Sequence, residues 1–147
     1  MGSGLFGMLD ISASGMSAER FRMEVVANNI ANAQTTRDVD GQPYRRKQVV
    51  FEAQLQDALS LNGGLLSDPQ MGGVRVAGVA PDMSDFHEIL QPNHPHADAD
   101  GVLKMPNVKL PNEMVDLVTA TRIYEANLKA IQSFKQMIEQ SLQILRS

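Results

Sequence analysis

The chain has 147 residues, a length that suggests one domain or one compact module with extended arms. Its 13 basic and 17 acidic residues give a net charge of −4, and no basic stripe with interleaved aromatic residues is present, which argues against a nucleic-acid binder. Cysteine is absent, which excludes disulfides, thiolate metal sites and cysteine nucleophiles.

Residues 1–36 are predicted to form an N-terminal helical arm. Its helix covers about residues 9–34, where apolar residues recur at helical spacing. Serine and glycine residues weaken the first turns, so we expect a firm helix only from about Ser17. We expect neither a secretory signal peptide nor a membrane-spanning segment, because the apolar runs are too short. The residues of this seam that we assign to an assembly interface are Met23, Val26 and Ile30.

Three asparagines cluster where this helix is expected to end. Asn28, Asn29 and Asn32 lie within one turn of each other, between small alanines that permit close approach of a second helix. Two interpretations stay open. Either the helix frays into a loop through residues that favour caps, or the asparagines fix the register between packed helices, as a polar residue does in a coiled-coil seam. Under the second interpretation all three belong to the interface.

A small β-rich module is predicted for residues 37–110. Arg45, Arg46 and Lys47 are expected on a solvated face, with contact to an acidic neighbour as the alternative. Paired glycines predict a loop over about residues 62–73. The predicted strands are Tyr44–Phe51, Val74–Val79, Phe86–Leu90 and Val102–Met105.

Four potential metal ligands alternate in this module: His94, His96, Asp98 and Asp100. Imidazole and carboxylate groups can hold a divalent ion, but two prolines interrupt the segment, so alternate residues need not share a face. We prefer a hydrogen-bonded turn. A metal-binding or metal-dependent hydrolytic protein is the alternative function. Other catalytic signatures are missing, so no enzyme activity, cofactor or metal is predicted.

The longest predicted element is a helix over residues 111–147, which is expected to pair with the helix over 9–34. From Asn112 onward it contains neither proline nor glycine, and Asn112 is predicted to cap its first turn. Two apolar stripes run along it, so it requires more than one neighbour. The interface residues that we assign to these stripes are Leu117, Tyr124, Asn127, Leu128, Ile131, Phe134, Met137, Ile138 and Leu142. The predicted fold class is mainly α, with long N- and C-terminal helices packed as a coiled coil and a short-stranded β insertion between them.

Several stretches resemble the proximal rod proteins of the bacterial flagellar basal body, within the family of flagellar axial proteins. The resemblance covers nearly the whole chain, except the first eight residues and the region from Gln54 to Gly73. The matching stretches are Ala27–Asn32 with Thr35, Asp40–Arg45, Lys47–Phe51, Gly101–Val108, Glu113–Val115 and Arg122–Asn127.

The resemblance implies a self-assembling structural subunit of the rod, the drive shaft that crosses the periplasm and transmits torque. The terminal helices would form an inner coiled-coil layer, with the β module outside it. The resemblance also implies export through the flagellar type III apparatus. The implied partners are other rod proteins and copies of this chain, with the basal-body ring, components near the export gate and peptidoglycan close by. A soluble coiled-coil adaptor of the cytoplasm stays open as a further interpretation.

Overall fold

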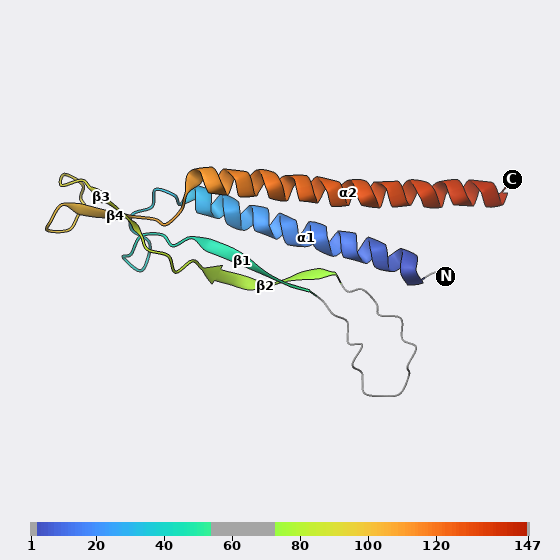
Figure 1. The fold of residues 1–147 in the computed structure, drawn as a ribbon, viewed down its shortest axis with the longest axis horizontal. Helices are drawn as coiled ribbons and strands as arrows, with labels where there is room; N and C mark the ends of the chain where they lie inside the picture. Colours follow the sequence, from blue (N-terminus) through green and yellow to red (C-terminus); the bar gives the residue numbers. More distant parts are fainter. Residues whose placement is uncertain (1–2, 54–72, 147) are drawn as a thin grey trace, which may run out of the picture. The chain divides into compact units, whose positions relative to one another are not determined.

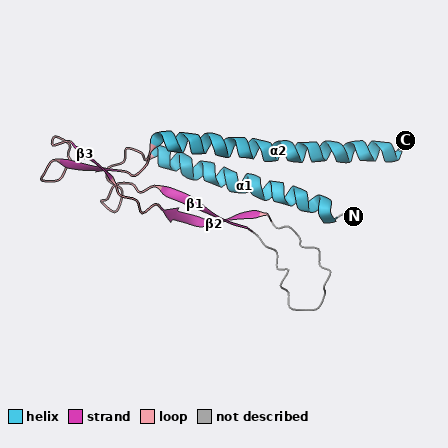
Figure 2. Ribbon diagram, in the orientation of Figure 1, coloured by secondary structure: helices cyan, strands magenta, loops and turns pink. Residues whose placement is uncertain are grey.

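The computed structural model describes residues 3–53 and 73–146, which form two helices and four short strands (Figures 1 and 2). Strand β1 pairs with β2, and β3 pairs with β4 in an antiparallel register that sets His87 opposite Met105. In chain order the elements are α1 (Ser3–Ala31), β1 (Lys47–Ala53), β2 (Val74–Pro81), β3 (His87–Leu90), β4 (Val102–Met105) and α2 (Leu110–Arg146). The prediction of a mainly α fold with a small β module is confirmed, and the coiled-coil geometry of the helices stays a prediction.

Helix α1 begins six residues earlier than expected, and it is continuous through the serines and glycines that predicted a loose start. The prediction of a firm helix only from about Ser17 is therefore wrong. Low helix propensity costs less than about 1 kcal/mol per residue, which packing can offset. Gly15 shows how: a Cβ at this position would lie 3.0 Å from the side-chain nitrogen of Asn127 in α2. The glycine weakens the helix locally but allows the other helix to come close.

Helix α2 has nearly the predicted bounds, but its cap differs. The carbonyl of Lys109 accepts the first helical hydrogen bonds, from the backbone N–H groups of Asn112 and Glu113. Asn112 therefore lies inside the first turn, so its prediction as the cap is wrong. Pro111 is tolerated in that first turn because a helix start leaves its N–H groups without intrahelical partners, and proline has none.

Strand β1 begins at Lys47 instead of Tyr44, because the preceding residues bond elsewhere. The N–H of Tyr44 donates to the carbonyl of Thr35, and the N–H of Arg46 donates to the side-chain oxygen of Asn107. The backbone N–H groups of these two residues are therefore not available for pairing with β2. Strand β4 has the predicted bounds. The predicted loop before β2 falls mostly on residues 54–72, outside the described part of the chain.

The described residues divide into two compact units. The first contains residues 3–21, 51–53, 73–77 and 120–146, and the second contains residues 22–50 and 78–119. In the first unit, the hydroxyl of Ser14 accepts the N–H of Val74 and donates to the carbonyl of Ile11, which fixes the start of β2 to α1. The second unit contains the asparagine cluster at the end of α1, the basic run Arg45–Lys47 and the four potential metal ligands.

Candidate assembly surface and polar junction

Asn29, near the end of α1, is the centre of the second unit. It is fully buried, and its side-chain nitrogen donates to the backbone carbonyl of Lys47 at 2.8 Å and to Glu113 at 2.9 Å. Its side-chain oxygen accepts the N–H of Lys47 at 3.0 Å and the hydroxyl of Tyr44 at 2.9 Å. The two donors and both lone pairs of the amide are therefore used. One side chain joins α1, the start of β1 and α2.

Glu113, in the first turn of α2, is fully buried beside this asparagine. One carboxylate oxygen accepts from Asn29, and the other lies 2.6 Å from the Nε of Arg46. Arg46 also lies 3.4 Å from Asp116 and 3.5 Å from Asp82. Burial by itself would lower the pKa of Arg46, but its hydrogen bond and ion pair with Glu113 raise it overall. A buried carboxylate is tolerated here because it is both paired and hydrogen-bonded.

The three residues of the basic run, Arg45, Arg46 and Lys47, therefore have different roles. Arg46 is half-buried and forms an ion pair with the buried Glu113, so the expectation of a solvated face is wrong for it and the acidic-neighbour alternative is confirmed. Arg45 donates to the carbonyls of Asp82 and Ser84. Lys47 is exposed, as expected.

Tyr44 supports the junction from the loop before β1. Its side chain is buried, and its hydroxyl lies 2.9 Å from the side-chain oxygen of Asn29 and 3.1 Å from that of Asn28. Burial raises the pKa of the phenol, and the negative charges of Asp38 and Glu113 raise it further. The hydroxyl therefore remains a neutral donor at physiological pH.

Asn32 makes local contacts, and Asn28 accepts hydrogen bonds from Asn32 and from the hydroxyl of Tyr44. The side chain of Asn32 donates to the carbonyl of Asn28 at 2.9 Å, and it accepts from the hydroxyl of Thr35 at 3.2 Å. These bonds fit the interpretation of a helix end stabilised by residues that favour caps. Asn29 fits the second interpretation, because it alone of the three bonds to α2. The sequence cluster thus contains both kinds of residue.

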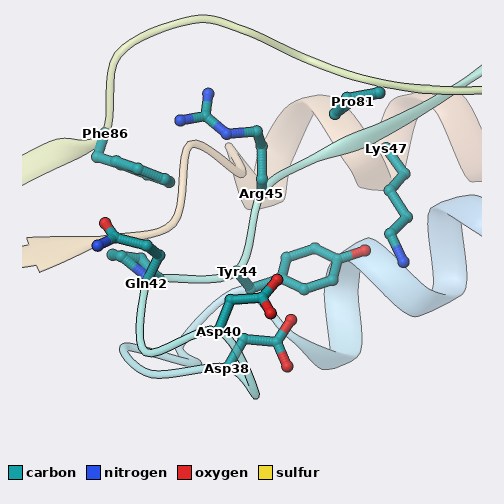
Figure 3. Close-up of a pocket in the computed structure, with 9 residues that line it drawn as sticks. Asp38, Asp40, Gln42, Tyr44, Arg45, Lys47, Pro81 and Phe86 are labelled. Atoms are coloured by element: carbon teal, nitrogen blue, oxygen red, sulfur yellow. The ribbon is translucent and has the colours of Figure 1, made fainter.

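A hollow of about 410 Å³ lies in the second unit next to Tyr44 (Figure 3). Its cationic groups lie against aromatic rings: the guanidinium of Arg45 is 4.3 Å from the ring centre of Phe86, and the ammonium of Lys47 is 5.6 Å from that of Tyr44. The lining contains no serine, cysteine or histidine, the residues of the usual nucleophile and base pairs. The lining residues are Asp38, Asp40, Gln42, Pro43, Tyr44, Arg45, Lys47, Pro81 and Phe86.

The four potential metal ligands lie in hydrogen-bonded turns. The Nδ1 of His94 accepts the backbone N–H of His96, and the Nδ1 of His96 lies 2.8 Å from the hydroxyl of Thr36. Asp98 and Gly101 close the next turn through their backbone groups. The preferred interpretation as a hydrogen-bonded turn is confirmed. In the part of the chain that the structure describes, these residues and Asp100 do not form a group of three or more arranged to hold a metal ion.

The predicted interface residues of the helices divide into a partly buried seam and three exposed positions. On α1, Val26 is buried, and Met23 and Ile30 are half-buried. The half-buried interface residues of α2 are spaced by threes, fours and sevens and come from both predicted stripes: Leu117, Tyr124, Asn127, Ile131, Phe134 and Ile138. The exposed ones are Leu128, Met137 and Leu142, of which Leu128 and Met137 lie on opposite sides of the helix. One seam of α2 is therefore partly buried among the described residues, and these three apolar side chains remain exposed.

Two members of this seam were missed from the sequence. Ala120 and Glu113 are both fully buried and continue the same spacing toward the start of α2. A small residue and a charged residue interrupt an apolar pattern, so periodicity alone treats them as gaps. The acidic residue in the first helical turn was the available signal, but an acid at this place is ordinarily explained by its favourable interaction with the helix dipole.

Among the described helices, none is long and apolar enough to cross a membrane. Two family models match the chain. One, described as flagella basal body rod protein, matches residues 9–37, and the other, described as flagellar basal body rod FlgEFG protein C-terminal, matches residues 99–144. Neither describes an enzyme.

Similar relatives carry the name flagellar basal-body rod protein FlgC. The protein of Bacillus subtilis is 42% identical, covering 95% of this chain and 97% of its own length. That of Borreliella burgdorferi is 38% identical, covering 97% of this chain and 99% of its own length. That of Aquifex aeolicus is 40% identical, with 95% and 96% covered.

Proposed function

The chain belongs to the FlgC type of flagellar basal-body rod proteins, and on that premise we propose that it assembles through its terminal helices into the rod that crosses the periplasm. It is a structural subunit of the flagellar rod. The observation that carries the proposal is the match over 97% of this chain and 99% of a rod protein. The proposed partners are other rod proteins and copies of this chain. The basal-body ring, components near the export gate and peptidoglycan are proposed neighbours.

The surface of α2 supports the assembly step. Leu128, Met137 and Leu142 are between 38% and 56% exposed, although each is a large apolar side chain. Exposed apolar surface is costly to leave in water, and burial of the exposed part of each side chain, about half of it, against another subunit would recover roughly 1 kcal/mol for each. The helices would then gain part of their stability only in the rod. This dependence agrees with export of an unfolded chain by the flagellar type III apparatus and with a shaft that transmits torque.

A charge at one of these exposed apolar positions tests this function. Leu128→Asp is expected to leave the free protein folded, because Leu128 is 38% exposed there. In an assembled rod the same carboxylate would be buried without a partner, so swimming and recovery of the protein in purified basal bodies should both be lost. Ser133→Asp, an exposed polar position of the same helix, is the matched control and should retain both. Normal incorporation of Leu128→Asp would contradict the proposed contact, and absence of the wild-type protein from basal bodies would contradict rod assembly itself.

A further inference from the structure

Two turns of the second unit share the sequence pattern Asp-x-Asp-Gly and the same backbone hydrogen bonds. In both, the N–H of the glycine donates to the carbonyl of the first aspartate at 2.9 Å. The N–H of that first aspartate donates to the carbonyl of the residue after the glycine, at 2.8 Å in residues 38–42 and at 2.9 Å in residues 98–102. Gly41 and Gly101 both have a positive φ, of 73° and 75°, which other residues adopt only with strain. The two turns therefore form a matched pair within one chain.

An aspartate followed by glycine rearranges slowly without an enzyme or a cofactor. The backbone nitrogen of the glycine attacks the side-chain carboxyl carbon of the aspartate, loses its proton and closes a cyclic imide as a water molecule leaves. Water then adds to either carbonyl of the ring and reopens it. Opening at the backbone carbonyl leaves the main chain running through the side-chain carbons, which is an isoaspartate of unchanged mass. Glycine favours the attack because it places no Cβ beside the nitrogen.

The two turns differ in the space around the glycine. Beyond its chain neighbours, a Cβ built on Gly41 would meet no described atom within 4 Å, and both Asp40 and Gly41 are exposed. A Cβ on Gly101 would lie 3.0 Å from the Cγ and 3.2 Å from the Cα of Pro92, and Gly101 is buried. Ring closure requires the peptide group between aspartate and glycine to rotate out of the turn. The first turn has room for this rotation, whereas in the second turn packed neighbouring atoms would have to move.

We propose that Asp40 is a site of spontaneous isoaspartate formation in the folded protein and that Pro92 protects the equivalent Asp100. This modification does not depend on the proposed function. The isoaspartate lengthens the main chain inside the turn, so the hydrogen bond between Asp38 and Gln42 is lost. Both residues, with Asp40, line the hollow of the second unit (Figure 3). The reaction therefore changes one wall of that hollow.

Tryptic mapping of the purified full chain, after several weeks at neutral pH and physiological temperature, tests this proposal. Trypsin separates the three pairs in which aspartate or asparagine precedes glycine into peptides 38–45, 48–75 and 76–104. The pair in the middle peptide begins at Asn62 and lies outside the described residues. Isoaspartate gives a second peak of unchanged mass, and electron-transfer fragmentation assigns its position. It should form at Asp40 at least about fivefold faster than at Asp100, because crowding of the second turn raises the barrier to rotation.

The unfolded chain and a conservative variant are the controls. In guanidinium chloride the contact with Pro92 is absent, so the rates at Asp40 and Asp100 should agree to within about twofold. Asp40→Glu keeps the charge but requires a larger ring, so the second peak of peptide 38–45 should disappear, and its persistence would contradict the assignment. Equal rates at Asp40 and Asp100 in the folded protein, or a slower rate at Asp40, would overturn the proposal. A difference of about fivefold that persists in guanidinium chloride would overturn the protective role of Pro92, because the sequence would then set the rates.

Discussion

Replacement of Asn29 by leucine should destabilise the protein more than any other change at the asparagine cluster. The substitution keeps the size of the side chain and removes four hydrogen bonds, two to Lys47 and one each to Glu113 and Tyr44. At about 1 kcal/mol net for each bond, and about 1–3 kcal/mol for a polar group left unpaired, the loss is roughly 5–7 kcal/mol. Burial of the new side chain returns about 2 kcal/mol. The expected net loss is therefore about 3–5 kcal/mol.

Urea unfolding of the purified protein, followed by circular dichroism, measures this loss. Asn32→Leu is the matched control, because it removes the same amide three residues later in the chain. The bonds of Asn32 are local, to Asn28 and Thr35, so we expect a loss below about 1 kcal/mol. Equal losses for the two variants would refute the assignment of Asn29 as the link between α1, β1 and α2. A loss for Asn29→Leu below about 0.5 kcal/mol would show that the buried amide contributes little.

Two further predictions concern a close contact and an acid-sensitive carboxylate. Gly73→Ala would place its Cβ 2.0 Å from the hydroxyl of Ser14, so the unfolding free energy should fall by about 1–3 kcal/mol, and Ser14→Ala in the same chain should restore part of it. Urea curves of the single and double variants measure this coupling. The N–H and hydroxyl of Ser84 lower the pKa of Asp82, with smaller contributions from Gln48 and Arg46. The contribution of the Asp82 carboxylate to the free energy of unfolding is therefore fully present above the ordinary aspartate pKa of about 3.9. It is lost as the pH falls toward the lower pKa that Asp82 has in the folded protein. The difference in urea midpoint between wild type and Asp82→Asn should therefore shrink below about pH 4, and a constant difference would contradict the shift.

Periodicity was sufficient to predict both helices and the short strands, because apolar spacing records which side of an element faces the interior. It was insufficient for Arg46 and Glu113. A basic run beside a strand and an acid in a first helical turn both resemble surface features, and their pairing joins residues 67 positions apart. Met114 illustrates the same limit. It fits the apolar stripe of Leu117 and Tyr124, but it is exposed, whereas Glu113 beside it is buried against Arg46.

The closeness of Gly15 and Asn127 has a consequence for the timing of folding. These residues are 127 − 15 = 112 positions apart, yet a methyl group on one would touch the other. At about 5–20 residues per second, a ribosome needs roughly 6–22 s to make the intervening chain. Helix formation takes only about a microsecond, so synthesis sets the delay, and the α1 segment spends nearly all of that interval without the residues that cover its seam. The newly made protein therefore leaves the apolar side chains of the α1 segment uncovered for seconds, and its first unit closes only when almost the last residues have been synthesised.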